Sequence, residues 1–412
     1  PAAYSEMDDV WGRPAGRPRF RGGCPCGRFW LYRGVVVYLC DRGAGRQGFY
    51  VLKKNIIHIL RRAVRVLLWG TLAVAGGCMK YGPIPEEDFS YPTPPGEVPE
   101  GVFIVCEGNF MYGNATLSFY LPSTGELQNE IFARANGMKL GDVAQSMTIH
   151  DGTAYVVVNN SGVIFGIDPV TFRIRRVIRG IGSPRYIWFR GGKAYVTSLY
   201  EPRIAVVDVA TASVESYIDT PGHTSTEQMV AFGDTLFVSC WSYDDTVLMV
   251  DLVAGEVAGE IKVRSQPRQM ALDGAGKLWV LTDGGYGEGA APGPPALYRI
   301  DAASGRIERE FVFRMGDTPR GLCVGAAGDT LYFLNGAVWR MDTEADELPQ
   351  HPFVPASNTI YYALGVDPHR GDVYVGDAID YQQQGVVYRF APDGRGLDTL
   401  KVGITPTAFC FR

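Results

Sequence analysis

Few side chains in this sequence are suited to catalysis or to metal binding. Four of its five histidines follow residue 78: His150, His223, His351 and His369. Only His223 is expected near a binding site, where it could approach the metal centre of a ligand or be a plain turn residue. The acids that could hold a cation or act as a general base are Asp244, Asp283 and Asp377. Because no spacing selects them, we predict no catalytic residue, no resident metal and no cofactor.

A stronger signal comes from polar side chains that recur at one equivalent position of a repeated pattern, at the start of its first strand. This column reads Thr407, Gln145, Arg185, Glu227, Arg268, Arg320 and Tyr362. In a circular fold such residues would ring a central funnel. Glu227 could pair with Arg185 or Arg268, so the column predicts either a ligand-binding mouth or a funnel lined by mutually satisfied charges.

Aromatic and amide side chains recur after the second strand of the same pattern, in loops expected on the same face. They are Phe110, Met111 and Tyr112, Asn159 and Asn160, Tyr200, Trp241 and Tyr243, Tyr286, Asn335, and Tyr381. Aromatic rings at exposed loop tips are unfavourable unless they contact something, and flat rings suit a macrocycle or a sugar. We predict that Phe110, Tyr112, Asn159, Tyr200, Trp241, Tyr243, Tyr286 and Tyr381 contribute to a ligand site, although individual rings could instead pack on neighbouring loops. The Gly- and Pro-rich insert 284–295 is expected to be a loop, with a lid as the alternative.

The elements that position these residues are seven repeats of short strands. An aromatic residue marks the second strand of each repeat: Phe103, Tyr155, Tyr195, Phe237, Trp279, Tyr332 and Tyr374. An Asp closes a later strand before a turn at Asp168, Asp208, Asp251, Asp301 and Asp342, where its carboxylate can accept backbone hydrogen bonds. Four short strands in each unit predict an all-β, seven-bladed β-propeller over residues 101–412. The repeats would thus form one ring rather than several domains.

The end of the chain predicts how this ring closes. Pro406-Thr-Ala-Phe409 matches the first strand of a repeat, as in Pro184-Arg-Tyr-Ile187, yet nothing follows it, and the repeat at Phe103 lacks a first strand. The C-terminal strand should therefore complete the N-terminal blade and remove the free sheet edges. Cys106 and Cys410 would then lie on adjacent strands, either as a disulfide or, like Cys240 and Cys323, as buried free thiols.

The first hundred residues resemble targeting segments rather than part of a folded domain. Basic residues 53–65 and the apolar run 66–77 predict a signal peptide over 51–78, because the run is too short to cross a bilayer. Ala75-Gly-Gly77 before Cys78 resembles a bacterial lipobox, which implies lipidation of Cys78, with cleavage without a lipid as the alternative. Residues 79–100 are Pro-rich and predict a tether. Residues 1–50, upstream of the signal peptide, are interpreted as mis-assigned upstream translation.

Charge is distributed unevenly along the chain. The net charge is −5, but residues 1–78 hold 13 of the 39 Lys and Arg and only 4 of the 44 Asp and Glu. The remainder is therefore strongly acidic. Nucleic acid is an unsuitable partner for such a surface, because phosphate binding depends on clustered basic residues.

Two sets of motifs resemble known families. Ala194-Tyr-Val-Thr197 and Tyr155-Val-Val-Val-Asn-Asn160 resemble the YVTN-type, surface-layer-like propellers. The segments Glu107-Gly-Asn-Phe110 and Gly141-Asp-Val-Ala-Gln-Ser-Met147 are similar to surface lipoproteins of Bacteroidetes type. Some of those lipoproteins capture vitamin B12 and pass it to a TonB-dependent outer-membrane transporter.

The resemblance implies a monomeric, lipid-anchored protein of the outer membrane, on the cell surface, that binds a scarce nutrient such as a corrinoid without catalysis. It identifies neither the ligand nor its contact residues. A quinoprotein- or lactonase-like propeller enzyme and a protein-binding scaffold remain the alternative functions, since propellers serve all three uses.

Overall fold

The computed structural model describes residues 31–32, 35–36, 100–285 and 292–412. The chain divides into two compact units, Pro1–Pro85 and Glu86–Arg412. In the first, β1 (Leu31–Tyr32) pairs antiparallel with β2 (Val35–Val36). The signal peptide, Cys78 and most of the tether lie outside the described residues, so those assignments stay predictions. No helix of the described part has the length and apolarity that a bilayer crossing needs.

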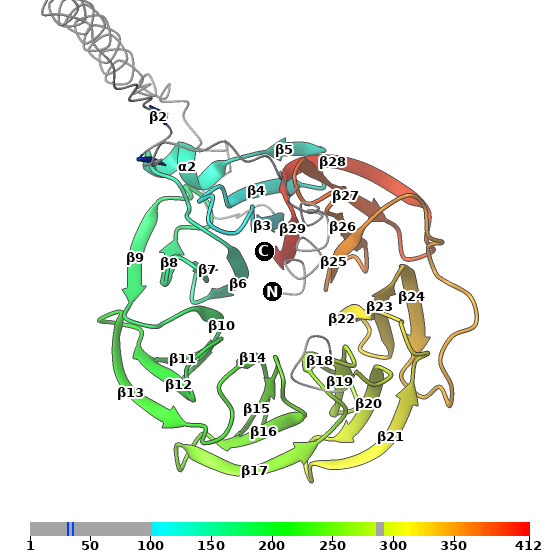
Figure 1. Ribbon diagram of the computed structural model, residues 1–412. Helices are drawn as coiled ribbons and strands as arrows, with labels where there is room; N and C mark the ends of the chain where they lie inside the picture. Colours follow the sequence, from blue (N-terminus) through cyan, green and yellow to red (C-terminus); the bar gives the residue numbers. More distant parts are fainter. Residues whose placement is uncertain (1–30, 33–34, 37–99, 286–291) are drawn as a thin grey trace, which may run out of the picture. The chain divides into compact units, whose positions relative to one another are not determined.

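The second unit is a ring of seven antiparallel sheets, as the repeats predict (Figure 1). The first complete blade in chain order consists of β6 (Ala144–His150), β7 (Thr153–Val158), β8 (Val163–Ile167) and β9 (Ile174–Arg179). The next consists of β10 (Pro184–Arg190), β11 (Lys193–Ser198), β12 (Arg203–Asp208) and β13 (Ser213–Asp219). The third consists of β14 (Thr226–Phe232), β15 (Thr235–Cys240), β16 (Thr246–Asp251) and β17 (Glu256–Lys262).

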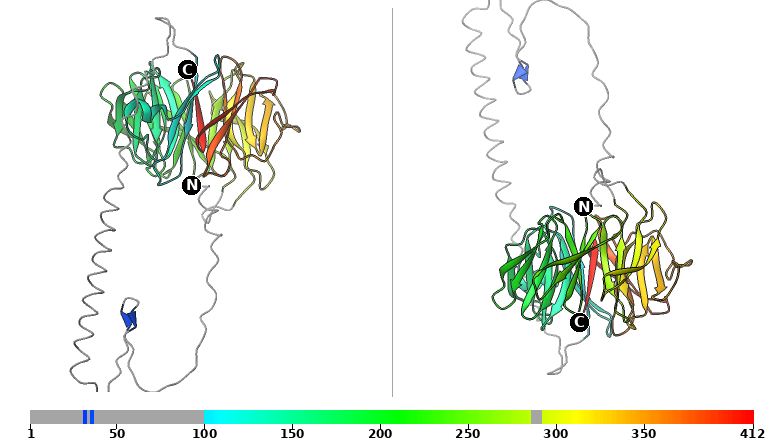
Figure 2. Two further views of the ribbon diagram at one scale, coloured as in Figure 1. Left: turned by 90° about the horizontal axis from the view of Figure 1, so that it is seen from above. Right: turned by 90° about the horizontal axis from the view of Figure 1, so that it is seen from below.

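The other half of the ring follows the same order. One blade consists of β18 (Pro267–Leu272), β19 (Lys277–Thr282), β20 (Ala296–Asp301) and β21 (Arg306–Val312). The next has β22 (Arg320–Val324), β23 (Thr330–Asn335) and β24 (Ala337–Asp342). The last consecutive blade consists of β25 (Tyr361–Val366), β26 (Val373–Asp377), β27 (Gln384–Phe390) and β28 (Gly396–Ile404). In every blade the first strand lies innermost, and the blades stand side by side around the axis (Figures 1 and 2).

The closing blade joins the two ends of the propeller. Its order is β29 (Pro406–Phe411), β3 (Val102–Cys106), β4 (Thr116–Leu121) and β5 (Glu126–Gln128). Phe409 pairs with Ile104 and Phe411 with Val102, which confirms the closure expected from the sequence. In this register Cys410 faces Phe103, whereas Cys106 faces Pro406. The disulfide alternative is therefore wrong: all four cysteines of the described part are free thiols, with Cys323 only half-buried.

The core lies between neighbouring blades. The seven column aromatics are all buried on second strands and fill these interfaces. Phe237 and Val247, for example, cluster with Met270 and Val280 of the next blade. Burying one large apolar side chain contributes about 1.5–3 kcal/mol, so the repeated aromatic is a main source of stability.

The turn Asp has the structural role that its position predicts. Asp251 Oδ1 accepts hydrogen bonds from the backbone N–H groups of Val253 (2.7 Å) and Ala254 (2.9 Å). These bonds lower the pKa of the Asp251 carboxyl, because they favour its charged form. The carboxylate thus fixes the turn into the outer strand.

Two features depart from the predicted pattern. The β22–β24 blade has three strands rather than four, and only a bridge between Val354 and Val338 stands where an outer strand would lie. Pro349, Pro352 and Pro355 interrupt that segment, and proline cannot donate to a strand ladder. The other departure is α2 (Ile131–Asn136), a short helix after β5 that packs Ile131 and Phe132 into the core.

Candidate functional site

One end of the ring collects both sets of residues singled out by the sequence. The residue after a second strand donates its backbone N–H to the residue before the first strand of the same blade: Asn159 to Val143, Trp241 to Ser225, and Ala378 to Ile360. Because these loops are hydrogen-bonded together, both sets lie on one face, as expected. We call this end of the ring the mouth.

A repeated backbone irregularity sets the direction of the mouth residues. In each of the seven first strands the pairing register shifts near the start of the strand. Gln145, Arg185, Glu227, Arg268, Tyr362 and Thr407 fall inside the shift, and Arg320 is at its border. A bulge bends the strand and re-aims the side chain of the unpaired residue. Six side chains are thereby released from the regular ladder at the mouth, whereas Arg320 still pairs with Leu334.

Arg185 and Glu227 form a buried ion pair between adjacent blades. Arg185 donates from Nε to Glu227 Oε2 at 2.5 Å and from Nη2 to Oε1 at 2.6 Å, with side chains only 4% and 1% exposed. The sequence left open whether Glu227 pairs with Arg185 or Arg268, and the structure selects Arg185. This part of the column is a satisfied pair, and its geometry is the strong bidentate one.

Arg268 lies beside this pair in a different setting. Its guanidinium carbon is 4.9 Å from the ring centroid of Trp241, and that of Arg185 is 5.6 Å from it. Trp241 donates from Nε1 to Asp283 Oδ2 at 3.0 Å. Burial raises the pKa of the Asp283 carboxyl despite that bond and the charges of Arg268 and Arg320. Trp241 is thus the centre of a polar cluster, and the expectation that it is an exposed loop aromatic is wrong, because it is fully buried.

The next part of the mouth contains Arg320, Tyr362 and Glu107. Arg320 lies 5.4 Å from the ring centroid of Tyr362, whose hydroxyl donates to Glu107 Oε1 at 3.2 Å. Burial raises the pKa of the Glu107 carboxyl, although the positive charges of Arg268 and Arg185 act to lower it. Tyr362 also meets Tyr381 edge to face, with ring centroids 5.7 Å apart. Two acids, Glu107 and Asp283, therefore belong to the mouth. Neither was among the predicted binding residues. Each directly follows a second strand, and this position is the signal that could have identified them.

Other predicted residues divide into buried and exposed ones. Asn159 is buried and donates its side-chain amide to the Pro184 carbonyl at 3.1 Å, and Gln145 is buried as well. Both are engaged within the propeller. The exposed large side chains of the predicted set are Phe110, Tyr112, Tyr200 and Tyr243, of which Tyr112 and Tyr200 are 75% and 71% exposed. Tyr286 lies outside the described residues.

The structure also brings His223 close to Asp244, with 2.7 Å between imidazole Nδ1 and carboxylate Oδ2. Both belong to a pocket of about 320 Å³ that Tyr243, Asp245 and Lys262 help to line. Spacing alone did not connect these residues, because His223 precedes β14 and Asp244 follows β15.

Comparison with known proteins agrees with this architecture. The family model described as a domain of unknown function, DUF5074, matches residues 100–391. The chain belongs to this family. The matched region contains every strand of the propeller except β28 and β29, and the family description assigns no ligand. No curated protein matches the sequence.

Several solved structures have a similar fold. A quinoprotein-alcohol-dehydrogenase-like protein from Bacteroides thetaiotaomicron is 16% identical with a TM-score of 0.59, over 76% of this chain and 78% of that one. A hydrazine synthase chain from Kuenenia stuttgartiensis is 15% identical with a TM-score of 0.55, over 65% and 89%. The WD40 propeller domain of Doa1 is 12% identical with a TM-score of 0.51, over 68% and 86%. At these identities the likeness shows the propeller fold alone.

Proposed function

We propose that this DUF5074 protein is a non-enzymatic binding protein that captures a flat nutrient, a corrinoid, at the mouth. One observation carries the proposal. Arg268 and Arg320 are half-buried at the mouth, each stacks over an aromatic ring, and neither forms an ion pair with a carboxylate of residues 100–285 or 292–412.

Such arginines have hydrogen-bond donors to offer to a ligand. A guanidinium presents five N–H groups in a fixed fork and suits carboxylate, phosphate and carbonyl oxygens. The rim of a corrin macrocycle carries amide carbonyl and phosphate oxygens, while its faces are flat. The exposed rings of Tyr112, Tyr200 and Tyr243 supply apolar surface for such a face.

The cellular setting is part of the same proposal. A chain lipidated at Cys78 and tethered by residues 79–100 would hold the propeller at the outer membrane, on the cell surface. A TonB-dependent transporter would then receive the ligand from the mouth. The motif resemblance and the predicted signal peptide support this setting.

Titration with cyanocobalamin tests the binding. The unit Glu86–Arg412 is compact by itself and the ring closes within it, so the protein from residue 79 onward is suitable. Calorimetry should give one site per chain, and the eluted complex should carry the visible absorption of the corrin. Arg268→Met and Arg320→Met should each weaken binding about 10- to 150-fold, the equivalent of about 1.5–3 kcal/mol for a hydrogen bond to a charged group.

Arg190→Met is the matched control. Arg190 is the last residue of β10, at the end opposite Arg185, and pairs with Asp234 on the surface. Its loss should leave the affinity unchanged. Absence of both heat and co-elution would refute corrinoid capture and turn attention to a protein-only scaffold or another nutrient.

A further inference from the structure

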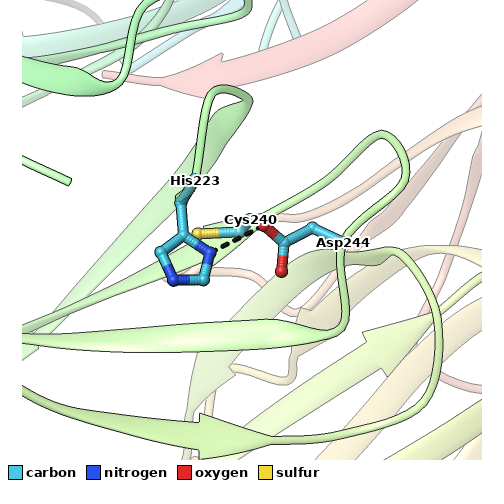
Figure 3. Close-up of side chains that lie close together, drawn as sticks. All are labelled: His223, Cys240 and Asp244. Carbon is cyan, nitrogen blue, oxygen red and sulfur yellow. Dashed lines mark hydrogen bonds and ion pairs between the residues drawn. The ribbon is translucent and has the colours of Figure 1, made fainter. Parts of the chain in front are cut away.

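Three potential metal ligands converge beside the mouth, within a single blade and its flanking loops. They are His223, between β13 and β14, Cys240, the last residue of β15, and Asp244, in the loop after it. One ligand atom of each lies within 4.8 Å of the others (Figure 3). We propose that His223, Cys240 and Asp244 bind a divalent transition-metal ion, Zn²⁺ foremost, with a fourth coordination position open to the adjacent pocket.

The imidazole of His223 is oriented for this role by its other nitrogen. Nε2 lies 3.3 Å from Glu260 Oε1, so the Nε2–H tautomer can donate to that carboxylate and offer its Nδ1 lone pair to a metal, in place of the contact with Asp244. Carboxylates that hold the far nitrogen of a ligating histidine are a general feature of zinc sites. The backbone of His223 is fixed as well, since its N–H donates to the Thr220 carbonyl at 3.0 Å and its own carbonyl accepts from Thr220 Oγ1 at 2.8 Å.

Asp244 is held with one oxygen turned toward the histidine. Its Oδ1 accepts from the backbone N–H of Asp245 at 2.7 Å, and its main-chain carbonyl accepts from the N–H of Gln266 at 2.7 Å. Oδ2 is left facing His223 Nδ1. Zinc bonds of about 2.0–2.3 Å in a tetrahedron separate ligand atoms by roughly 3.3–3.8 Å. The 2.7 Å contact must therefore open by about 0.6 Å, and a separation near the 4.8 Å limit must close by about 1 Å, through side-chain rotation.

The ligand types determine which metal fits. A thiol and an imidazole favour zinc and its neighbours over Ca²⁺ or Mg²⁺, which prefer oxygen ligands alone. The local charge favours a cation too, because Asp244, Asp245 and Glu260 gather here beside Lys262. Cys240 has no exposed surface, so it is placed to bind an ion between these residues and not to attack a substrate.

The pocket of about 320 Å³ supplies the open position. His223 and Asp244 line it together with Tyr243, Asp245 and Lys262. Three protein ligands with a free fourth position are typical of zinc ions that hold a water or a ligand atom, whereas structural sites close with four protein ligands. The inference does not depend on corrinoid capture, because none of the arginines of the mouth takes part in it and Tyr243 is the one residue common to both sites.

Metal binding is tested on the protein from residue 79 onward, stripped of metal with a chelator. Zn²⁺ titrated in a calorimeter should give one equivalent per chain. Co²⁺ in place of Zn²⁺ should give visible bands of tetrahedral cobalt and a thiolate-to-cobalt charge-transfer band in the near ultraviolet. Cys240→Ser should abolish that band, and Cys323→Ser, the matched control on β22, should retain it.

Further variants separate binding from folding. His223→Ala and Asp244→Ala change loop residues and should each abolish stoichiometric Zn²⁺ binding, while thermal melting checks that the variants are folded. Glu260→Gln should keep one site but lower its affinity about 10- to 100-fold, as expected when a partner of a ligating histidine is weakened. Absence of Zn²⁺ and Co²⁺ binding, or unchanged binding in folded His223→Ala and Asp244→Ala proteins, would overturn the proposal.

Discussion

Replacing Arg185 with methionine tests whether the interior of the mouth depends on the Arg185–Glu227 pair. The substitution keeps most of the side-chain volume but leaves the carboxylate of Glu227, which is 1% exposed, without its two charge-assisted hydrogen bonds. Removing one partner of a buried ion pair costs about 3–5 kcal/mol. Arg268, whose charge also acts on this region, should hold the loss near the lower end of that range.

Urea and thermal unfolding measure this loss. A ring of roughly 300 residues has an unfolding entropy near 0.6 kcal/mol per degree, so a loss of about 3 kcal/mol lowers Tm by about 5 °C. The double variant Arg185→Met/Glu227→Met buries no unpaired charge, and we expect it to unfold within about 1–2 kcal/mol of the original protein. Arg190→Met, which removes a surface pair, should cost less than about 1 kcal/mol.

Two results would refute the reasoning. One is an Arg185→Met protein that unfolds with nearly its original free energy. The other is a double variant as unstable as the sum of the two single variants, because the pair would then contribute nothing through coupling.

Three more predictions follow from contacts at the ring closure. Burial would raise the pKa of Asp398, but hydrogen bonds from Tyr120 and Arg389 lower it overall. Asp398→Asn should therefore cost about 1.5–3 kcal/mol at pH 7. The difference in free energy of unfolding between the two proteins should disappear below about pH 4, because the Asp398 carboxyl is then itself protonated. A difference in urea titrations that does not change with pH would contradict this prediction. Deleting β29 leaves β3 as a free edge, and light scattering should then show aggregation where the complete ring is monodisperse. Gly403→Ala places a methyl group 2.0 Å from Thr116 Oγ1 and should cost about 1–3 kcal/mol in thermal unfolding, whereas Gly396→Ala, with open space around it on the same strand, should cost less.

The fold was largely predictable because its signals are repeated and local. The buried aromatic of each second strand and the orphan strand at Pro406 are visible as patterns, and the structure places both as expected. The helix α2 and the missing outer strand of the β22–β24 blade were not predicted. Each of these features occurs only once, so the repeat pattern does not predict it.

The site was less predictable, because its contacts join residues from different repeats. The column placed Arg185, Glu227 and Arg268 at the mouth, but their spacing is the same for either possible pair. Only the positions of adjacent blades show that Arg185 takes Glu227. The burial of Trp241 was missed for a similar reason: its partner Asp283 comes from the next blade. Proximity of Cys240 to His223 likewise requires the turn geometry and not the sequence interval.

Because of the bulge at the start of every first strand, the residues proposed to contact a ligand can differ without changing the pairing of the strands. A residue inside a bulge has no partner across the strand, so its side chain is not needed to fix the strand register. Thr407, Gln145 and Arg268, for example, differ in size, charge and chemistry at equivalent places of one regular ring. Residues at these positions can therefore be substituted one at a time to suit a different ligand, while the seven sheets stay unchanged. For protein engineering, the unpaired positions among these seven are sites that can be varied, whereas the Arg185–Glu227 pair and the Tyr362–Glu107 hydrogen bond join parts of the ring to one another.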